Sequence, residues 1–350
     1  MGGTVLVVGA GYAGVTAANR LARTSGTEVT LADPRDEFVE RIRLHRLAAG
    51  SGPATVPLAR VLDPRVRTRR ARVTAIGDGT VTLDDGGGLR FDRLVYAVGS
   101  GGSGTPADEG YRVDTLEAAT RLRTAVAGLA AGAPVVVVGG GPTGVETVTE
   151  LAGARPDLRV RLVTDAEVAA GLGAPARQRV RDRLAGLGVE LREHTVVTDP
   201  IGLGAALLVW ATRPGVPDLA RRSGLPVDGA GRLVVDRTLT SVGDARIVGA
   251  GDAVVAPAEV GFVRESCQAA VPLGVAAART VRAGLRGRPA PAASVVYRAV
   301  CLSLGPGSGL VQAVDRRDVP RPLTVGGRTG AVVKEQVCRY TVRAVRGRVA

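Results

Sequence analysis

The order of apolar and polar positions near the start of the chain predicts a strand, a helix and a second strand. The apolar run Thr4–Val8 leads into a glycine-rich turn, and residues 13–24 then have helical spacing with few breakers. Glu28–Ala32 has the pattern of the next strand, and Asp33 follows it. Because both strands are short and mostly apolar and a helix joins them, the pattern is typical of a parallel β-α-β unit.

The same order recurs in the middle of the chain. The apolar run 134–138 leads into a second glycine-rich turn, a helical pattern continues to about Leu151, and a strand pattern over Arg159–Val163 ends shortly before Asp165. The two copies begin about 130 residues apart, which is too far for a solenoid repeat. The sequence therefore predicts an α/β protein that contains two domains of the same kind.

The rest of the chain alternates further strands with helices. Helical patterns cover residues 176–187 and 266–284. A Gly- and Ser-rich stretch at 99–104 is typical of a hinge. The strand patterns are Arg72–Ile76, Thr80–Leu83, Arg90–Val95, Val189–Arg192, Leu207–Trp210, Arg232–Val235 and Ile247–Gly249.

The composition predicts a folded protein with a sizeable core. Of the 350 residues, 45% are hydrophobic and 23% are charged, which excludes a disordered chain. No apolar run reaches the roughly 20 residues that span a bilayer, and no charged leader precedes the first strand, so we expect a cytoplasmic protein. Cys267, Cys301 and Cys338 lie far apart, which argues against a disulfide scaffold, a zinc site or a dithiol centre.

Basic residues exceed acidic ones, but they give no firm signal for nucleic acid. The chain has 46 cations and 33 anions, and Lys334 is its single lysine. The excess is greatest at residues 60–72 and 321–350, while aromatic residues, which interleave with basic ones in nucleic-acid sites, make up only 3%. We interpret the excess as a solvated Arg-rich surface, with weak attraction to an anionic membrane as the second interpretation.

Each glycine-rich turn has the spacing GxGxxG, in which every glycine has a physical task. The first permits a tight turn, the second lets the backbone approach a pyrophosphate, and the third lets the helix pack closely on the strand. An acid about 20 residues beyond the last glycine can bind a ribose, and Asp33 and Asp165 have this spacing. The two sets of glycines are Gly9, Gly11 and Gly14, and Gly139, Gly141 and Gly144.

A third motif indicates that one of the two dinucleotides is FAD. Thr240 is followed by six residues, four small or apolar residues and then Gly251 and Asp252. This spacing places Asp252 at a strand end near the first domain, where it can bind the hydroxyls of a ribityl chain. Two turns resemble those that close such domains, namely residues 96–100 (YAVGS) and 210–213 (WATR).

On these motifs the chain resembles the two-domain flavoproteins of the pyridine nucleotide–disulfide oxidoreductase fold. Within that fold it is most similar to type II NADH dehydrogenases and the apoptosis-inducing-factor-like NADH:quinone reductases. The resemblance implies two three-layer, Rossmann-like domains, the first interrupted by the second. Residues 1–105 and 236–283 would form the FAD domain, 106–235 the NAD(P) domain, and 284–350 a small C-terminal module.

The resemblance also implies which residues bind the cofactors. NAD(P)H would be held by Gly139, Gly141, Pro142, Thr143, Gly144 and Asp165. Asp165 favours NADH because a carboxylate repels a 2′-phosphate, although Arg159 and Arg161 lie close to it in the sequence. FAD would be held by Gly9, Gly11, Tyr12, Ala13, Gly14, Asp33, Val73, Ala97, Gly99, Gly251, Asp252, Gln268 and Ala269.

Glu146 and Gln268 are the candidates for catalysis. Glu146 matches a glutamate that faces the nicotinamide region in type II dehydrogenases, and Gln268 lies in a segment resembling one beside the isoalloxazine, where it would contact flavin or quinone. The alternatives are a first-turn acid favoured by the helix dipole and a solvent-facing helix residue. Disulfide reductases carry a cysteine pair near residues 38–50, and this chain has none there, so electrons must pass from the flavin directly to an acceptor.

We therefore expect an FAD-dependent NAD(P)H dehydrogenase that favours NADH, uses no metal and reduces a quinone-like or other small acceptor. Two alternatives stay open: a flavin oxidoreductase acting on an organic metabolite, and a slow NADH-binding flavoprotein with a nucleic-acid- or protein-binding role. Residues 331–345 have apolar positions between basic ones. This segment is a helix on the inner membrane surface, a helix packed on the flavin domain or an oligomer contact.

Overall fold

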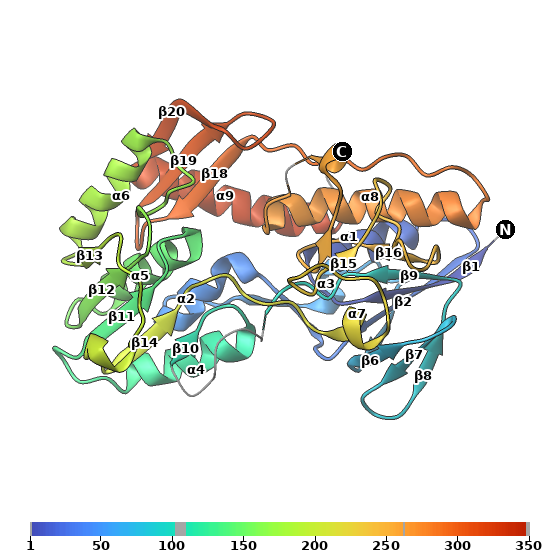
Figure 1. Ribbon diagram of the computed structural model, residues 1–350, viewed down its shortest axis with the longest axis horizontal. Helices are drawn as coiled ribbons and strands as arrows, with labels where there is room; N and C mark the ends of the chain where they lie inside the picture. The colour runs from blue at the N-terminus through green and yellow to red at the C-terminus, as the bar shows by residue number, and fades with distance from the viewer. Residues whose placement is uncertain (1, 102–109, 262, 348–350) are drawn as a thin grey trace.

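The computed structural model describes residues 2–101, 110–261 and 263–347, and the expected domain boundary at residues 105 and 106 lies outside them. Two parallel five-stranded sheets lie toward opposite ends of the molecule, and a small antiparallel sheet with a long helix runs along one side (Figure 1). None of the described helices is long and apolar enough to cross a membrane.

The first sheet joins strands from distant parts of the chain. Its order is β16-β9-β1-β2-β5 and every pairing is parallel. Helix α8 (Cys267–Leu285) packs on α1 (Tyr12–Leu21) so closely that a Cβ on Gly274 would overlap the Ala13 carbonyl oxygen. The strands are β1 (Gly3–Val8), β2 (Thr27–Asp33), β5 (Arg67–Arg70), β9 (Arg93–Tyr96) and β16 (Ile247–Gly249).

The second sheet repeats this plan with the order β10-β14-β11-β12-β13, again all parallel. Alternate residues of its central strand enter different apolar clusters: Val135 and Val137 face the main core, and Val136 and Val138 face a smaller one. The elements are β10 (Tyr111–Arg112), α4 (Leu116–Ala127), β11 (Pro134–Val138), α5 (Pro142–Ala154), β12 (Arg159–Val163), α6 (Ala174–Gly186), β13 (Glu190–Arg192) and β14 (Leu207–Trp210).

The C-terminal module is an antiparallel sheet covered by one helix. Its elements are β18 (Ala299–Ser303), β19 (Gly309–Val314), β20 (Pro320–Gly326) and α9 (Gly327–Val345). Helix α9 also contacts α1 and α8. The buried Asn19 fixes its far end, because the Asn19 amide donates to the carbonyls of Val345 at 2.7 Å and Val61 at 2.8 Å. The C-terminal helix is therefore packed on the first sheet's helices, as one of the three alternatives predicts.

Smaller elements connect these layers. Two short strands pair beside the first sheet, a three-stranded antiparallel sheet projects from it, and a two-stranded parallel pair precedes α8. They are β3 (Glu37–Val39), η1 (Arg41–Arg43), α2 (Leu44–Ala49), β4 (Thr55–Pro57), α3 (Leu58–Val61), β6 (Val73–Ile76), β7 (Thr80–Leu83), β8 (Gly88–Arg90), η3 (Ile201–Leu203), α7 (Leu219–Arg222), β15 (Leu233–Val234), β17 (Val254–Val255) and η4 (Ala258–Val260).

The patterns missed several strands, namely β3, β4, β5, β10, β17, β18, β19 and β20. The strands that they did predict agree with the structure to within two residues, with one exception. The run Arg90–Val95 is not one strand, because β8 ends at Arg90 in the antiparallel sheet and β9 begins at Arg93 in the parallel sheet. The chain changes sheets at Phe91, a buried residue whose N–H donates to the Gly79 carbonyl at 2.9 Å. A local strand pattern does not reveal such a change of partner.

Candidate functional site

The first glycine turn leaves open space in front of helix α1. Gly9 has φ +103°, and a Cβ on Gly14 would overlap the Gly9 carbonyl oxygen, so strand and helix cross at van der Waals contact. A Cβ on Gly11, in contrast, would meet nothing within 4 Å. Gly11 is the N-cap of α1 and no side chain caps the helix, so its first N–H groups can bind an anion such as a pyrophosphate.

The second glycine turn has the same geometry. Gly139 has φ +117°, a Cβ on Gly144 would overlap its carbonyl oxygen, and a Cβ on Gly141 would meet nothing within 4 Å. Gly141 is the N-cap of α5, again without a side-chain cap, and Pro142 and Thr143 follow it in exposed positions. Both turns therefore fit a dinucleotide diphosphate.

The two acids predicted to bind ribose are not equivalent in register. Asp33 lies directly beyond the β1–β2 pairing, and its Oδ2 accepts the N–H of Ala10 at 2.8 Å. In the second unit β12 pairs with β11 up to Val163, so the matching position is Thr164, and the exposed Asp165 follows one residue later. Counting residues from the last glycine could not tell Thr164 from Asp165, because the spacing depends on the length of the helix between the strands. Helix α5 has 13 residues, whereas α1 has 10.

Asp252 lies at the edge of the first glycine turn. The Cβ of Ala13 would be 3.4 Å from a Cβ on Gly251, which precedes Asp252 and has φ +90°. Asp252 Oδ2 accepts the hydroxyl of Ser100 at 2.8 Å and lies 3.6 Å from the Arg41 guanidinium. The structure therefore brings the two ends of the predicted flavin site together.

Three further predicted residues line or support this turn, and a fourth, Val73, lies in the projecting sheet. Ala97 is buried, and its carbonyl oxygen closes the space beside Gly9, while Gly99 follows with φ +68°. Tyr12 packs edge-on against Phe38 at 5.0 Å, and its buried hydroxyl has no partner among the described residues. Val73 is buried in β6, at the base of the projecting sheet.

Gln268 does not project freely into solvent. It is half-buried near the start of α8, and its Oε1 accepts the Arg264 guanidinium at 3.1 Å. Arg264 also pairs with Asp318 at 2.8 Å and lies over the Tyr297 ring at 5.0 Å, which connects Gln268 to the C-terminal module. Ala269, the next residue, is buried and donates its N–H to the N-cap hydroxyl of Ser266 at 3.3 Å.

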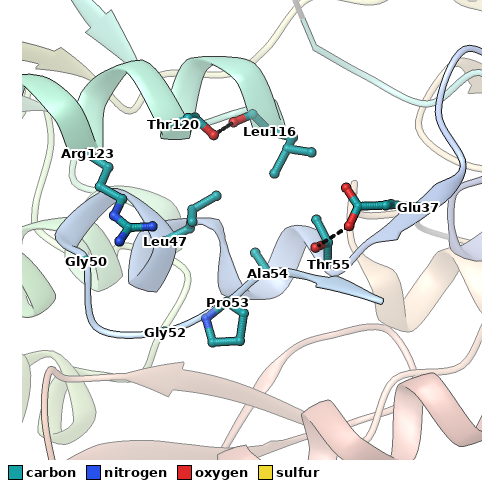
Figure 2. A pocket seen from close by; sticks show the side chains of 10 residues that line it. All are labelled: Glu37, Leu47, Gly50, Gly52, Pro53, Ala54, Thr55, Leu116, Thr120 and Arg123. Carbon is teal, nitrogen blue, oxygen red and sulfur yellow. Dashed lines mark hydrogen bonds between the residues drawn. The ribbon is translucent and has the colours of Figure 1, made fainter. Parts of the chain in front are cut away.

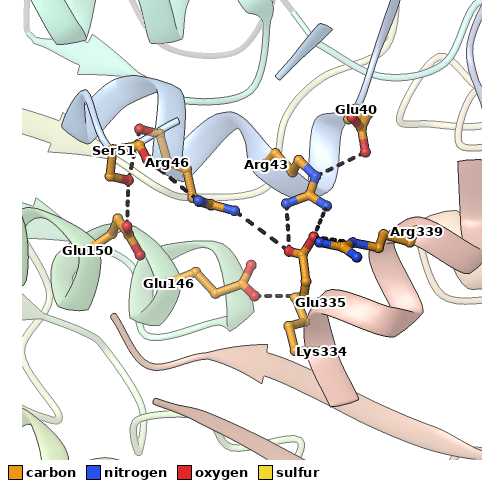
Figure 3. Close-up of polar contacts among 9 residues, drawn as sticks. All are labelled: Glu40, Arg43, Arg46, Ser51, Glu146, Glu150, Lys334, Glu335 and Arg339. Carbon is orange, nitrogen blue, oxygen red and sulfur yellow. Dashed lines mark hydrogen bonds and ion pairs between the residues drawn. The ribbon is translucent and has the colours of Figure 1, made fainter. Parts of the chain in front are cut away.

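Glu146 forms a buried ion pair with the single lysine of the chain. The Lys334 ammonium of α9 lies 2.8 Å from Glu146 Oε1 of α5, and the two side chains are only 14% and 11% exposed (Figure 3). The N–H of Ser303 also donates to Glu146 Oε1 at 2.8 Å, and Lys334 donates to the Cys301 carbonyl at 3.0 Å. Glu146 is therefore more than an acid favoured by the helix dipole.

Each member of the pair keeps the other charged. Burial alone would lower the pKa of Lys334, but the Glu146 carboxylate outweighs it and raises that pKa well above its usual range. Burial alone would raise the pKa of Glu146, but Lys334, His45 and the Ser303 N–H lower it. The pair is consequently ionised at neutral pH.

The surroundings of the pair connect both glycine turns. His45 Nδ1 lies 3.7 Å from Glu146 Oε2, and both side chains are almost fully buried. Burial raises the pKa of the Cys267 thiol to about 11, although Lys334 opposes the rise, and Glu146 and Asp252 add to it. The carboxylates of Glu146 and Asp252 therefore both act on one thiol, at the start of α8.

One cavity of the structure lies apart from the predicted site residues. It has a volume of about 530 Å³ and lies between α4 and the segment from α2 to β4 (Figure 2). Its polar lining includes Glu37, bonded to Thr55 at 2.9 Å, and Arg123 of α4. None of the predicted site residues lines it.

Sequence reasoning missed three cations of the site. Arg41 contacts Asp252, and Lys334 contacts Glu146, each from a distant part of the chain. Arg264 is only four residues from its partner Gln268, but it belongs to no motif. Only Lys334 carries a signal, because it is the one lysine among 46 cations.

Known proteins resemble the chain in sequence and fold. Residues 3–274 match the pyridine nucleotide-disulphide oxidoreductase family. An NADH dehydrogenase-like protein of Mycobacterium tuberculosis is 34% identical over 86% of this chain and 85% of its own length. The sulfide:quinone oxidoreductase of Aquifex aeolicus has a TM-score of 0.80 at 19% identity, covering 98% of this chain and 91% of its own. NDH2 from Plasmodium falciparum, solved in complex with NADH, has a TM-score of 0.78 at 15% identity, covering 98% and 97%.

We expect Lys334→Met to destabilise the protein by about 3–5 kcal/mol at pH 7, because Glu146 would stay buried without its partner. Burial would then raise the pKa of Glu146, so the loss should shrink as the pH falls toward the usual range of a carboxyl group. Urea unfolding at several pH values measures the difference. Arg339→Met, on the exposed side of the same helix, is the control. An equal cost at pH 4 and pH 7 would contradict the buried-charge explanation.

Proposed function

Because the chain belongs to the pyridine nucleotide-disulphide oxidoreductase family, it is an NAD(P)H-dependent flavoprotein oxidoreductase, and we propose that it uses FAD to pass electrons from NADH to a quinone-like acceptor. The sulfide:quinone oxidoreductase and the NADH complex among its fold neighbours are consistent with this assignment. The organic-metabolite alternative has no specific observation in its favour.

One observation carries the proposal: both glycine turns are open to a diphosphate, and the helix of the second turn carries one member of a buried, ionised pair. Glu146 belongs to the helix of the second turn, and the charges of Glu146, Lys334 and Asp252 act together at Cys267 beside the first. A site for electron transfer between two dinucleotides needs both turns directed at one place. The sheet order also supports the proposed division of the chain into a first domain, residues 1–105 with 236–283, and an inserted domain, residues 106–235. Strand β16 of the later segment joins the first sheet, beside strands from the first segment.

The residues of the chain would bind and orient the reactants. The N–H groups at the starts of α1 and α5 would hold the two diphosphates, Asp33 the FAD ribose and Asp252 the ribityl hydroxyls. The bound flavin would supply the chemistry that takes two electrons from NADH and delivers them to the acceptor. Gln268, held by Arg264, would orient flavin or quinone, and the Glu146–Lys334 pair would hold a proton beside the acceptor.

The thiols do not provide an alternative route for electrons. All three cysteines are free, and burial raises the pKa of each above its usual value, so they stay protonated. A protonated thiol is a poor nucleophile, which argues against dithiol chemistry. This supports direct transfer to a small acceptor.

The basic segment at residues 60–72 has little charge left for a nucleic acid. Four of its arginines pair with acids of the same surface, and three of those acids come from outside the segment. The pairs are Arg65 with Asp63, Arg67 with Glu28, Arg69 with Asp85 and Arg70 with Asp36. The nucleic-acid-binding alternative is therefore less well supported than the enzyme.

The C-terminal module offers a surface for a membrane. Val332 and Tyr340 of α9 are 61% and 55% exposed, Leu323 of β20 is 68% exposed, and arginines lie between them. We propose that this face attaches the protein peripherally to an anionic bilayer, which would bring it to a lipid-soluble quinone.

The glycine turns predict opposite outcomes for one matched pair of substitutions. Gly11→Val should give a colourless protein, because the side chain fills the space for the flavin diphosphate. Gly141→Val should stay yellow but lose bleaching by NADH and lose menadione reduction, because only the second diphosphate is blocked. Visible absorption and anaerobic NADH titration measure both. A yellow Gly11→Val protein, or a wild type that does not reduce menadione with NADH, would refute the assignment.

The charge of Asp165 predicts a preference for NADH. Asp165→Asn should raise the ratio of kcat/KM for NADPH to that for NADH by about tenfold, since a nearby carboxylate no longer repels the 2′-phosphate. Asp182→Asn, on the exposed face of α6, is the charge-matched control. If the ratio does not change, Asp165 lies too far from the ribose to discriminate, and Thr164 alone occupies that position.

Vesicle flotation tests the membrane face. Wild type should float with vesicles that contain phosphatidylglycerol and remain below with pure phosphatidylcholine, because arginines need anionic headgroups. Val332→Ser combined with Tyr340→Ser should lower the floating fraction several-fold. Val196→Ser, an equally exposed valine near the second sheet, should leave it unchanged. Equal flotation of wild type and the double variant would exclude this face.

A further inference from the structure

Reduction of a quinone consumes a proton that NADH does not supply. NADH delivers two electrons and one proton as hydride, and the quinol carries two protons, so NADH + H⁺ + quinone gives NAD⁺ + quinol. The second proton has to reach the acceptor from solution through the protein. This requirement rests on the proposed function, and it directs attention to buried titratable groups near the Glu146–Lys334 pair.

A cavity of about 360 Å³ reaches this pair from the surface. It lies between α2, α5, α9 and the turn that joins β18 to β19. Its lining is mixed, and its polar members include His45, Ser51, Glu150, Ser303 and Lys334. Ser51 is exposed, whereas Glu150 and His45 are 4% exposed, so these polar groups lead from solvent to the buried pair. A space of this size with several polar groups can hold water.

His45 is one of the buried residues that line this cavity. Its Nδ1 is 3.7 Å from Glu146 Oε2, a gap that a small side-chain rotation closes. Its Nε2 is buried and has no hydrogen-bond partner among the described residues. Toward the surface, the Ser51 hydroxyl donates to Glu150 (Figure 3).

We propose that His45 passes the second proton from this cavity to the Glu146–Lys334 pair. A small rotation of the ring brings Nε2 to the cavity, a proton from cavity water bonds to Nε2, the Nδ1–H bond breaks, and that proton goes to Glu146 Oε2. The pair gives one proton to the reduced quinone oxygen, and the arriving proton replaces it. A change of tautomer then returns His45 to its starting form, so charge and protons balance over one turnover.

The charges around His45 are consistent with such a relay. Burial lowers the pKa of His45, so the resting ring is neutral and its free nitrogen can accept a proton. Glu146 and Glu150 of α5 oppose that shift, while Lys334 of α9 and Arg46 of its own helix add to it. Helix α4, on the other side of α2, directs Arg123 to the separate cavity beside Leu47.

The choice of acceptor separates proton delivery from electron transfer. Menadione needs the extra proton, whereas ferricyanide takes electrons alone. His45→Leu should lower NADH:menadione turnover by about tenfold or more and leave NADH:ferricyanide turnover and the flavin spectrum unchanged. His194→Leu replaces the only other histidine, which is exposed beyond β13, and should change neither rate. Glu150→Gln, at the outer part of the cavity, should reproduce the menadione effect if His45→Leu does not fold.

Proton NMR gives a test that does not depend on turnover. The chain has two histidines, so the ring signals that remain in His194→Leu belong to His45. They should titrate at a pH below the usual histidine range, and Lys334→Met should move the titration upward because a repelling charge is removed. A His45 signal that does not titrate between pH 4 and 9 would overturn the proposal.

The kinetic outcomes distinguish a failure of the His45 relay from a failure of the quinone reductase assignment. If wild type reduces menadione and His45→Leu slows neither acceptor, or slows both equally, the relay is wrong and the quinone reductase assignment stands. If wild type does not reduce menadione at all, the proposed function is wrong and the relay falls with it.

Discussion

The crossing of a strand and a helix without any intervening side chain is the constraint on which both halves of the structure depend. Gly14 contacts the carbonyl of Gly9, and Gly144 contacts that of Gly139, so a Cβ at either position would force the layers apart. The close crossing directs the uncapped helix start along the strand end, where Gly11 or Gly141 leaves room for a ligand. Packing and anion binding thus follow from one contact, made twice.

The C-terminal module becomes part of the site through buried charge. Glu146 lies under the second turn, and both groups that neutralise its Oε1, the Lys334 ammonium and the Ser303 N–H, belong to that module. Arg43 of the first domain binds Glu335 of α9 at 2.9 Å and lowers the pKa of Glu335 to about 2. Removing α9 would leave the buried Glu146 carboxylate without its cation and Arg43 without Glu335. The module therefore stabilises the site in addition to covering it.

Local pattern predicted the strands on either side of each glycine turn, the turns themselves and the approximate place of each acid, because these depend on neighbours in the sequence. It failed where the answer depends on pairing between distant strands. Only the register shows that Thr164, rather than Asp165, corresponds to Asp33. Arg41 and Arg264 could not be found, since each is one arginine among many and meets its partner only after folding. Composition did mark Lys334, because a single lysine in an arginine-rich chain stands out.

The chemistry of an ammonium explains why that one position differs from the others. Lys334 has to reach both Glu146 and the Cys301 carbonyl, and its side chain is only 14% exposed in the enclosure that surrounds it. A guanidinium is larger and planar, has five donors to satisfy, and does not lose its proton in proteins. An ammonium is compact, and its pKa responds to burial and to a neighbouring charge. Arginine could also neutralise Glu146, but its planar fork would bring more N–H donors than this enclosure pairs, so the compact ammonium of lysine is the cation that fits.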